Sequence, residues 1–499
     1  QVPAGDHVLR ESDGAADFAA YLLAGPWAAP REVRLAGGLD AEGGGLAVEG
    51  LRPGLAAAVW ADLGAEHVGQ ILLECDCPTA GVMDVGWGER LLPDGRPDFI
   101  HKGVSYADRV LARPGRVLWE PIAFTGARYL AVVLRGFRGE VRLRRWGMRS
   151  TEPDLSWAGR FDCDDDRLRR IWALCERSCR VGTQEGLMDC PTREQAEYVG
   201  DGHPVARWIA MLTGDLSYWR YLVAESFARQ TRGGLVRSTL FTGRRGSLID
   251  YDLLAVIGTR DYLARSGDAA TARGVLPALR RVLDWFRARR DDTGLLRIGA
   301  ETLDYTSSQE DLYDPAGLDE PWGTALFIDH AGMGWHNVGD PPIDRRGTNA
   351  AINALFVVSL RALAEIEDAL GAGGAEALRA EADRTAAAAA KAFYDEKRGV
   401  FVDGVLDGER LAQVSQQTNT WCLWAGLCPR PRRRAVLERI LRDDDRTMAR
   451  SGPYFWSYML PILAAEGMHR EALEHIRRLW GPMLDAGATT LWETFAGDE

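Results

Sequence analysis

Acidic residues gather in one short, irregular stretch of the sequence, MDCPTREQAEYVGDGHP at positions 188–204. Asp189, Glu194 and Asp201 lie there among prolines, glycines and an arginine. A fourth acid, Glu493, follows Trp492 in GATTLWETF near the end of the chain. Two carboxylates from distant loops are what cleavage of a glycosidic bond requires. One gives a proton to the leaving oxygen, and the other activates water or attacks the sugar.

Each of these acids also has a simpler interpretation. Asp189 and Asp201 could cap helices or pair with Arg193. Glu194 could be a solvated surface acid, and Glu493 could belong to a loose chain end. For one acid alone the simpler interpretation prevails. Several acids in a loop shaped by proline and glycine favour a functional site.

The elements that must position these residues change character near residue 155. Up to residue 154, short runs alternate between apolar and polar residues and are broken by Gly, Pro and Asp. This pattern predicts an antiparallel β-sandwich over residues 1–154. The alternation is weakest in residues 1–65, which are rich in Gly and Ala.

From residue 155 to residue 499 the apolar residues recur with a helical period. About ten helices are expected, in hairpins joined by short Gly, Pro and Asp turns. Such a row of hairpins forms either an open solenoid or a closed toroid. Acids and aromatic residues follow alternate helices, which favours closure, because a toroid gathers those loops at one mouth.

Composition excludes several classes of function. The chain has 72 acidic and 60 basic residues and a net charge of −12, which argues against a nucleic-acid partner. No run approaches the roughly 20 apolar residues that a membrane span needs. The eight cysteines and the isolated histidines lack metal-ligand spacing, and no Gly-rich phosphate loop follows a strand. No metal and no cofactor are therefore expected. The 17 tryptophans fit either large cores or sugar-stacking surfaces.

The stretch MDCPTREQAEYVGD resembles the acid-loop motif of the bacterial α-L-rhamnosidases, glycoside hydrolase family 78. That motif has Asp-Cys-Pro, a polar residue, Arg and Glu, and later Gly-Asp. The stretch from GPYFWSYML to LWETF resembles the end of the same family's helical domain, which leads into a Trp-Glu pair. Further resemblances occur in VGWGERL, WEPIAFTGARYL, GRFDCDDDRLRRIWALCERS, RRGTNAAINALF and SQQTNTWCLWAGL. Together they extend over roughly residues 70 to 495, which a chance motif would not do.

The resemblance implies an (α/α)6 barrel, or six-hairpin toroid, behind the β-sandwich, and hydrolysis of terminal α-L-rhamnosides with inversion. By position, Glu194 would be the general acid and Glu493 the general base. Inversion places such carboxyl groups about 6.5–9.5 Å apart. The substrate-binding residues that the resemblance implies are Asp189, Arg193, Tyr198, Asp201, Asp329, His330, Trp335 and Trp492.

The sequence departs from the family pattern at three places. The family usually has Leu-Gly-Trp-Thr before the Gly-Asp, and here Tyr198 stands at the aromatic position. A Gly-Asp-Trp stretch appears as FIDH, which retains Asp329 and places His330 where the family has Trp. Trp335 and the neighbouring His336 could supply the altered surface, or the histidines could be ordinary loop residues. The family barrel normally continues past the Trp-Glu pair, so a truncated helical domain is expected.

Three alternatives to a rhamnoside hydrolase remain at this stage. The same fold and mechanism could act on a different sugar. A non-catalytic carbohydrate-binding relative would lack Glu194 or Glu493, and both are present. An α-solenoid scaffold would scatter its acids over the outer helix faces. The absence of a signal-peptide pattern favours the cytoplasm, although the chain begins with Gln and not Met. Nothing indicates the oligomeric state.

Overall fold

The computed structural model describes residues 32–36, 46–51, 56–93, 95, 97–101, 104–240, 246–303, 324–329, 341–442 and 447–495. The chain divides into two compact units. The first unit comprises Gln1–Asp154, Arg180–Glu185 and Cys190–Gln195. The second comprises Leu155–Cys179, Gly186–Asp189 and Ala196–Glu499.

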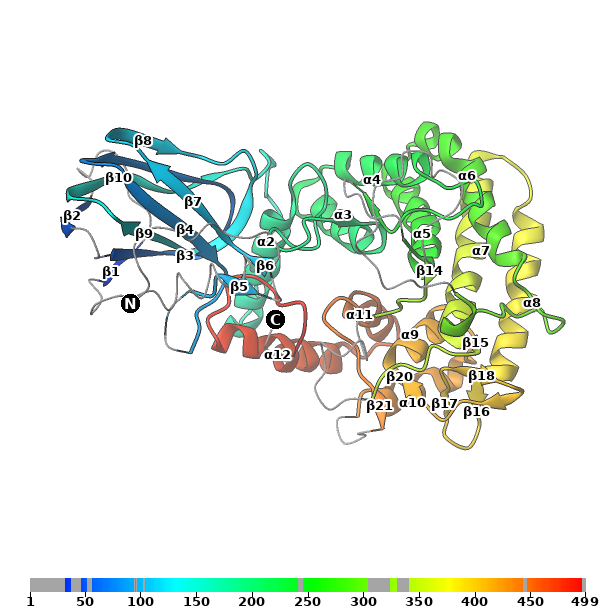
Figure 1. The fold of residues 1–499 in the computed structure, drawn as a ribbon. Helices are drawn as coiled ribbons and strands as arrows, with labels where there is room; N and C mark the ends of the chain where they lie inside the picture. Colours follow the sequence, from blue (N-terminus) through cyan, green and yellow to red (C-terminus); the bar gives the residue numbers. More distant parts are fainter. Residues whose placement is uncertain are drawn as a thin grey trace. The chain divides into compact units, whose positions relative to one another are not determined.

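One eight-stranded sheet forms the first unit (Figure 1). Its strands are β1 (Glu32–Ala36), β2 (Leu46–Leu51), β3 (Ala56–Cys77), β4 (Gly81–Gly88), β7 (Ala107–Ala112), β8 (Gly115–Trp119), β9 (Thr125–Arg135) and β10 (Gly139–Ser150). A separate pair is formed by β5 (Ile100–His101) and β6 (Val104–Ser105). The predicted antiparallel sheet is confirmed, except that β1 pairs with β3 in parallel.

The long strand β3 organises this sheet. Its first part pairs with β1 and β9, and its last part pairs with β8 and β10. Val59 and Ala61 from the first part enter the same apolar core as Ile71 and Leu73 from the last part. These residues alternate along the strand, as the period of two requires. Two differently paired halves around one core are what a β-sandwich needs.

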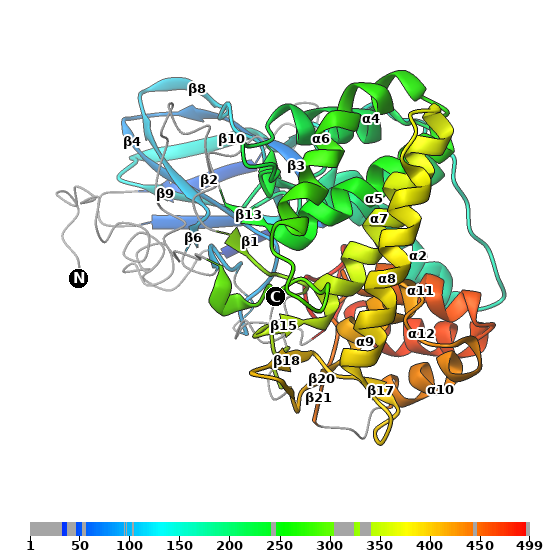
Figure 2. The ribbon, with the colours of Figure 1, turned by 90° about the vertical axis from the view of Figure 1, so that its right-hand side faces the viewer.

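Eleven α-helices lie in the described part of the chain. They are α2 (Asp166–Gly182), α3 (Val199–Thr213), α4 (Ser217–Ala228), α5 (Ile249–Ser266), α6 (Ala269–Arg287), α7 (Ala350–Leu370), α8 (Ala375–Phe393), α9 (Gln416–Trp424), α10 (Arg430–Ile440), α11 (Trp456–Ala465) and α12 (His469–Asp485). From α3 onward, consecutive helices pack in pairs, α3 with α4 through to α11 with α12. Figure 2 shows α7 and α8 side by side. The predicted helical hairpins are therefore present.

Alternate helices also contact one another in the series α3, α5, α7, α9, α11. These helices are more deeply buried than the helices they pair with. α5 and α7 are buried around most of their circumference, whereas α6 and α12 bury one face. A helix that other helices surround needs apolar residues on all sides. At the ends of the array, α2 meets α12, where Arg167 on α2 donates to both carboxylate oxygens of Asp485 at 3.0 and 2.6 Å.

Four alternate helices begin directly after a two-residue strand. These strands are β11 (Glu197–Tyr198), β13 (Ser247–Leu248), β15 (Thr348–Asn349) and β20 (Val414–Ser415). Each pairs with a short strand elsewhere in the second unit, namely β12 (Thr239–Leu240), β14 (Thr324–Ala325), β18 (Gly404–Leu406) and β21 (Met448–Ala449). The remaining short elements are β16 (Tyr394–Asp395), β17 (Val400–Phe401), β19 (Glu409–Arg410) and the 3-10 helix η1 (Ala300–Thr302). The pairing fixes the backbone where each of the four helices starts.

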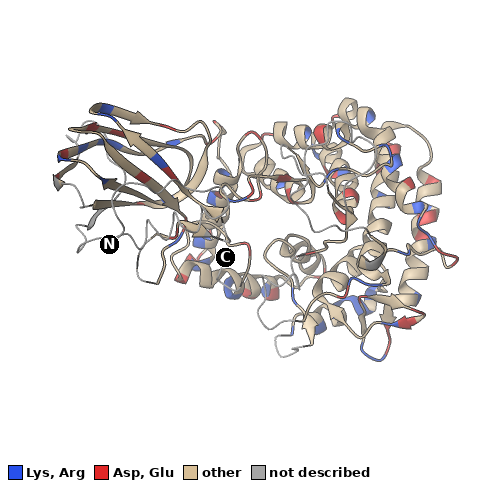
Figure 3. Cartoon of the chain, in the orientation of Figure 1, with Lys and Arg blue, Asp and Glu red and all other residues tan. Residues whose placement is uncertain are grey.

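Charged residues of both signs are interspersed along the helices of the second unit (Figure 3). On α10, Arg432 pairs with Glu396 at 2.8 Å, and Arg434 pairs with Glu438 at 2.8 Å and with Glu471 at 3.0 Å. The Arg-rich sequence of this helix is thus matched by acids. None of the helices in the described part of the chain combines the length and the apolar character needed to cross a membrane.

Candidate active site

A pair of hydrogen bonds closes the loop that carries the sequence motif. The backbone N–H of Asp189 donates to the carbonyl oxygen of Ala196 at 2.9 Å, and Ala196 N–H donates to Asp189 Oδ1 at 2.9 Å. We call the six residues between them, Cys190–Gln195, the acid loop. Asp189 is exposed, and one of its carboxylate oxygens is used to close this loop.

Contacts within the acid loop fix its backbone further. Glu194 N–H donates to Cys190 Sγ at 3.3 Å, and the Gln195 side-chain amide donates to the carbonyl of Pro191 at 2.9 Å. Gln195 has a φ of 50°, in the left-handed region that few non-glycine residues adopt. The backbone on both sides of the Glu194 side chain is therefore held in place.

The acid loop belongs to the first unit, whereas Asp189 and Ala196 belong to the second. Three hydrogen bonds join the loop to β9 and to the residues directly before β9 and after β4: Gly126 N–H to Pro191 O at 2.9 Å, the Gln195 amide to Phe124 O at 3.0 Å, and Thr192 Oγ1 to Glu89 Oε2 at 3.2 Å. At Gly126 an added Cβ would lie 2.6 Å from Pro191 Cγ, so only glycine allows this approach.

Arg193 and Glu194 form an ion pair, with Arg193 Nη1 3.2 Å from Glu194 Oε1. The two side chains are 18% and 14% exposed, so the pair is shielded but still reachable. The guanidinium can grip a carboxylate or a hydroxyl-bearing ligand with several parallel donors.

Tyr198 and Asp201 lie at the start of α3. Tyr198 is the last residue before the helix, and Asp201 is in its first turn, where the helix dipole favours negative charge. Asp201 Oδ1 accepts a hydrogen bond from the hydroxyl of Tyr251 on α5 at 2.9 Å. The ring of Tyr198 meets the ring of Tyr251 edge-on, with centroids 6.3 Å apart.

Asp329 is completely buried. Its Oδ2 accepts hydrogen bonds from the Gln417 side chain at 2.7 Å and from Gly452 N–H at 2.9 Å. Asp329 thus ties the start of α9 to the segment before α11. This position is deeper than that of Asp201, which is partly exposed.

A second buried acid, Asp250 on α5, anchors the residues before Asp329. Its two oxygens accept from the backbone N–H groups of Phe327 and Ile328 at 2.9 and 3.0 Å. Burial raises the pKa of Asp250 to about 6, although these N–H donors and the nearby Arg345 oppose the rise. Arg345 in turn donates to the carbonyl oxygens of Phe327 and Asp329. The backbone around Asp329 is therefore rigid.

The C-terminal segment presents Glu493 to solvent. Leu491 N–H donates to Ser178 Oγ on α2 at 2.7 Å, and Phe495 meets a tryptophan of α12 edge-on at 4.9 Å. Trp492 is partly buried and packs against the helical core, whereas Glu493 is exposed. The backbone around Glu493 is thus fixed while its carboxylate remains accessible.

The structure brings Tyr198, Asp201 and Asp329 to one region of the second unit. Tyr251 joins them, because its ring also meets Phe327 edge-on at 5.5 Å. His330 and Trp335 lie outside the described residues. Within the described part of the chain, no group of three His, Cys, Asp or Glu side chains could hold a metal ion.

Sequence reasoning missed Tyr251, Asp250 and Gln417. A signal was present, because IDYD at 249–252 and SQQTNT at 415–420 place polar residues at the starts of helices that are otherwise buried. Buried polar groups need partners, so such runs indicate a network at these helix starts.

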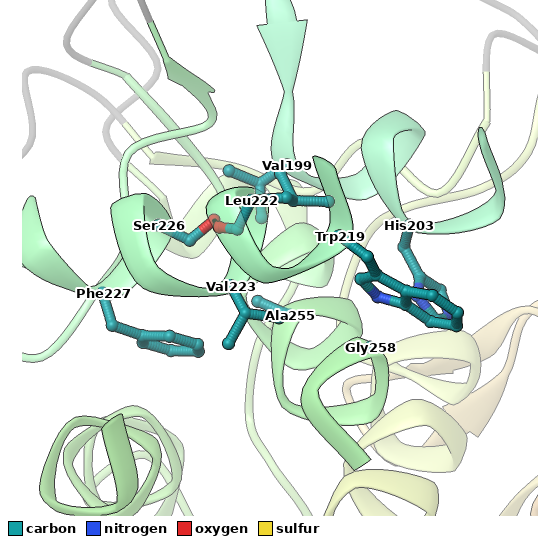
Figure 4. A pocket seen from close by; sticks show the side chains of 9 residues that line it. All are labelled: Val199, His203, Trp219, Leu222, Val223, Ser226, Phe227, Ala255 and Gly258. Atoms are coloured by element: carbon teal, nitrogen blue, oxygen red, sulfur yellow. Dashed lines mark hydrogen bonds between the residues drawn. The ribbon is translucent and has the colours of Figure 1, made fainter. Parts of the chain in front are cut away.

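A small pocket lies between α3, α4 and α5 (Figure 4). Its lining is mostly apolar, apart from Ser226 and the imidazole of His203, which lies beside the indole of Trp219. His203 Nε2 is 3.4 Å from Asp261 Oδ2. A sugar needs several convergent polar groups, so this pocket does not fit one.

The fold and the site define a domain of helical hairpins that carries acids at the starts of alternate helices and in the adjoining loops. Residues 156–499 match the family described as the bacterial α-L-rhamnosidase 6 hairpin glycosidase domain. The chain therefore belongs to this family.

Solved structures show the same fold. The GH78 family rhamnosidase of Bacillus sp. GL1 matches with a TM-score of 0.77 and 24% identity over 90% of this chain and 44% of that chain. A rhamnosidase from Klebsiella oxytoca with rhamnose bound gives 0.73 and 20% over 90% and 83%. The Streptomyces avermitilis α-L-rhamnosidase complexed with L-rhamnose gives 0.60 and 18% over 91% and 41%. This chain spans less than half of the Bacillus and Streptomyces proteins. Among curated proteins no match was found.

Proposed function

We propose that this chain is an inverting, exo-acting glycoside hydrolase that releases terminal α-L-rhamnose from glycosides or oligosaccharides. The observation that carries the proposal is the setting of the two glutamates. In a chain of this family, Glu194 and Glu493 each extend from a backbone segment fixed by hydrogen bonds, and both side chains remain accessible.

In the proposed reaction Glu194 is the general acid and Glu493 the general base. Glu194 protonates the glycosidic oxygen as the bond to the anomeric carbon breaks. Glu493 removes a proton from a water molecule, which attacks the anomeric carbon from the opposite face. The attack inverts the configuration, and no covalent intermediate forms.

Sugar binding is assigned to polar and aromatic residues of the sequence motifs. Asp189, Arg193 and Asp201 would hold hydroxyl groups by charge-assisted hydrogen bonds. Tyr198 and Trp492 would offer ring faces to the apolar side of the sugar. Asp329, His330 and Trp335 complete the proposed set.

We propose that the helices form an (α/α)6 barrel. The contacts along α3, α5, α7, α9 and α11 and the contact of α2 with α12 support it. In this proposal residues 1–154 are an accessory sandwich and residues 155–499 are the catalytic domain.

The choice of rhamnose rests on the family and on the two related proteins that hold this sugar. The same mechanism on another sugar is the second candidate. This candidate is favoured by Tyr198, which stands where the family usually has Trp and whose ring contacts Tyr251.

The proposal is tested by hydrolysis of p-nitrophenyl α-L-rhamnopyranoside beside a panel of other p-nitrophenyl sugars. We expect turnover of the rhamnoside, and a fall of at least about a thousandfold in Glu194→Gln and Glu493→Gln. Proton NMR should show the β-anomer as the first product. Glu185→Gln, at an exposed acid close to the motif, is the matched control and should keep full activity.

Each departure from this result has a distinct meaning. Turnover of a different sugar, lost in both variants, would retain the mechanism and reassign the specificity. Turnover that survives both substitutions would contradict the assigned roles. No turnover of any sugar would contradict the enzyme proposal and leave a carbohydrate-binding relative.

A further inference from the structure

Tyr251 contacts Asp201, one of the proposed sugar-binding acids, yet no sequence motif pointed to it. Its side chain is 3% exposed. Its hydroxyl donates to Asp201 Oδ1 at 2.9 Å. Because Asp201 is partly exposed and Tyr251 is buried, the hydrogen bond connects an accessible carboxylate to the interior of the domain.

The ring of Tyr251 is clamped by other rings. It meets Tyr198 and Phe327 edge-on, with centroids at 6.3 and 5.5 Å, and it lies tilted against Tyr454 at 6.5 Å. Edge-on aromatic contacts are favourable and directional. The ring therefore has little freedom to move, and its hydroxyl points in one fixed direction.

The backbone of α3 is shaped to receive the same ring. A Cβ added at Gly200 would lie 2.3 Å from Tyr251 Cδ1, closer than atoms approach in proteins. Only glycine at position 200 lets the ring lie directly beside the residue that precedes Asp201. Gly200 and Tyr251 therefore form a matched pair.

Tyr251 also stays protonated. Burial raises its pKa well above the usual range, and the negative charge of Asp201 adds to the rise. Tyr251 is thus a permanent hydrogen-bond donor to Asp201.

We infer that Tyr251 is a positioning residue that orients Asp201 toward the sugar and, through its contact with Tyr198, couples the carboxylate to the aromatic surface of the site. This inference rests on the proposed function. A carboxylate held by a clamped donor does not have to be ordered when the sugar binds, so the cost of binding is lower.

The experiment is a comparison of Tyr251→Phe with Tyr262→Phe. Tyr262 lies on the same helix, is equally buried, and donates to the carboxylate of Asp268 at 2.8 Å. Asp268 caps α6 and has no place in the proposed site. Both substitutions remove one hydroxyl and one tyrosine–aspartate hydrogen bond, so the control reproduces the structural part of the change.

We expect Tyr251→Phe to raise KM for the hydrolysed glycoside about tenfold and to lower kcat less than about threefold. Tyr262→Phe should change neither. In the Asp201→Asn background, Tyr251→Phe should change kcat/KM less than about twofold, because a residue that acts through Asp201 has no effect once the carboxylate is gone. Gly200→Ala should reproduce the KM effect of Tyr251→Phe.

Other outcomes overturn the inference and separate it from the proposed function. If Glu194→Gln abolishes turnover and Asp201→Asn lowers kcat/KM, but Tyr251→Phe behaves like Tyr262→Phe, the inference is wrong and the proposed function stands. Equal losses from Tyr251→Phe with and without Asp201 would show that Tyr251 does not act through it. If the intact protein hydrolyses none of the sugars, both are overturned.

Discussion

At the scale of single residues, the most unusual side chain near the acid loop is Glu197. It is 1% exposed, and within the described residues neither oxygen of its carboxylate accepts a well-formed hydrogen bond. Burial raises its pKa to about 7, the charge of Glu225 adds to this, and the N–H of Leu187 opposes it. Glu197 is therefore neutral in mildly acidic solution.

This shift reverses the usual dependence of stability on pH for an acid. The folded protein holds the Glu197 proton up to about pH 7, whereas the unfolded chain releases it near pH 4.5. Stability is therefore lost as pH rises between these values, by an amount on the order of 3 kcal/mol. Glu197→Gln removes this loss.

Thermal unfolding at two pH values tests this prediction. Glu197→Gln and the wild type should melt at similar temperatures at pH 4, and the variant should melt higher at pH 8. Glu185→Gln, at an exposed position, should follow the wild type at both. A variant that melts lower than the wild type at pH 8 would mean that the carboxylate is ionised and stabilised in the fold.

At the scale of elements, the acid loop depends on a close approach at Gly126. Replacing Gly126 with Ala puts a methyl group 2.6 Å from Pro191 Cγ and 2.7 Å from Glu66 Oε1. Overpacking of this kind costs about 1–3 kcal/mol. The loop must move, and a displacement of about 1 Å at a catalytic group costs up to a hundredfold in rate.

We therefore expect Gly126→Ala to lower kcat/KM at least about tenfold. Gly274→Ala is the control, because nothing lies within 4 Å of its added Cβ on α6, and it should leave kcat/KM unchanged. It should also stabilise the helix by up to about 1 kcal/mol. A destabilised Gly126→Ala protein with normal kcat/KM would show that the acid loop does not hold the proton donor.

Prediction from sequence identified the types of secondary-structure element but not all of the contacts between them. The periods of two and 3.6 residues predicted the sheet and the helical hairpins, because burial of one strand face or one helix stripe leaves a local pattern. The parallel pairing of β1 and the attachment of Pro191 to Gly126 depend on residues far apart in the chain, and no local pattern records them.

The same distinction applies to the site. The acid loop was found because its motif is contiguous in sequence. Tyr251 and Asp250 were missed because their roles depend on contacts with residues 50 and 77 positions away. The roles of Glu194, Glu493 and the residues assigned to sugar binding remain predictions, which the kinetic experiments above test.

At the scale of the whole molecule, Ser178 connects the first described helix to the segment that carries Glu493. Its Oγ donates to Leu174 O and accepts from Leu491 N–H, a residue 313 positions away. Ser178→Ala removes the hydroxyl oxygen that accepts this N–H. The segment around Glu493 should then lose its fixed position.

We expect Ser178→Ala to lower kcat about threefold to tenfold with little change in KM, because displacement of the proposed base would affect the chemical step more than binding. Ser266→Ala is the control. Its Oγ likewise donates to a carbonyl one turn back and accepts a backbone N–H, but that N–H belongs to the nearby Asp268. Equal kcat values for both variants would contradict a role of the Ser178 contact in placing Glu493.

The membership of the acid loop in the first unit has a consequence for protein engineering and for the exchange of modules between relatives. A cut at residue 154 follows the change from strands to helices, but it separates Cys190–Gln195 from Glu89, Phe124 and Gly126, to which it is hydrogen-bonded. A hybrid that combines a foreign sandwich with these helices would inherit an unsupported acid loop. An exchange of modules must therefore transfer Gly126, Phe124 and Glu89 together with the acid loop. These segments form one structural unit although they lie far apart in the sequence.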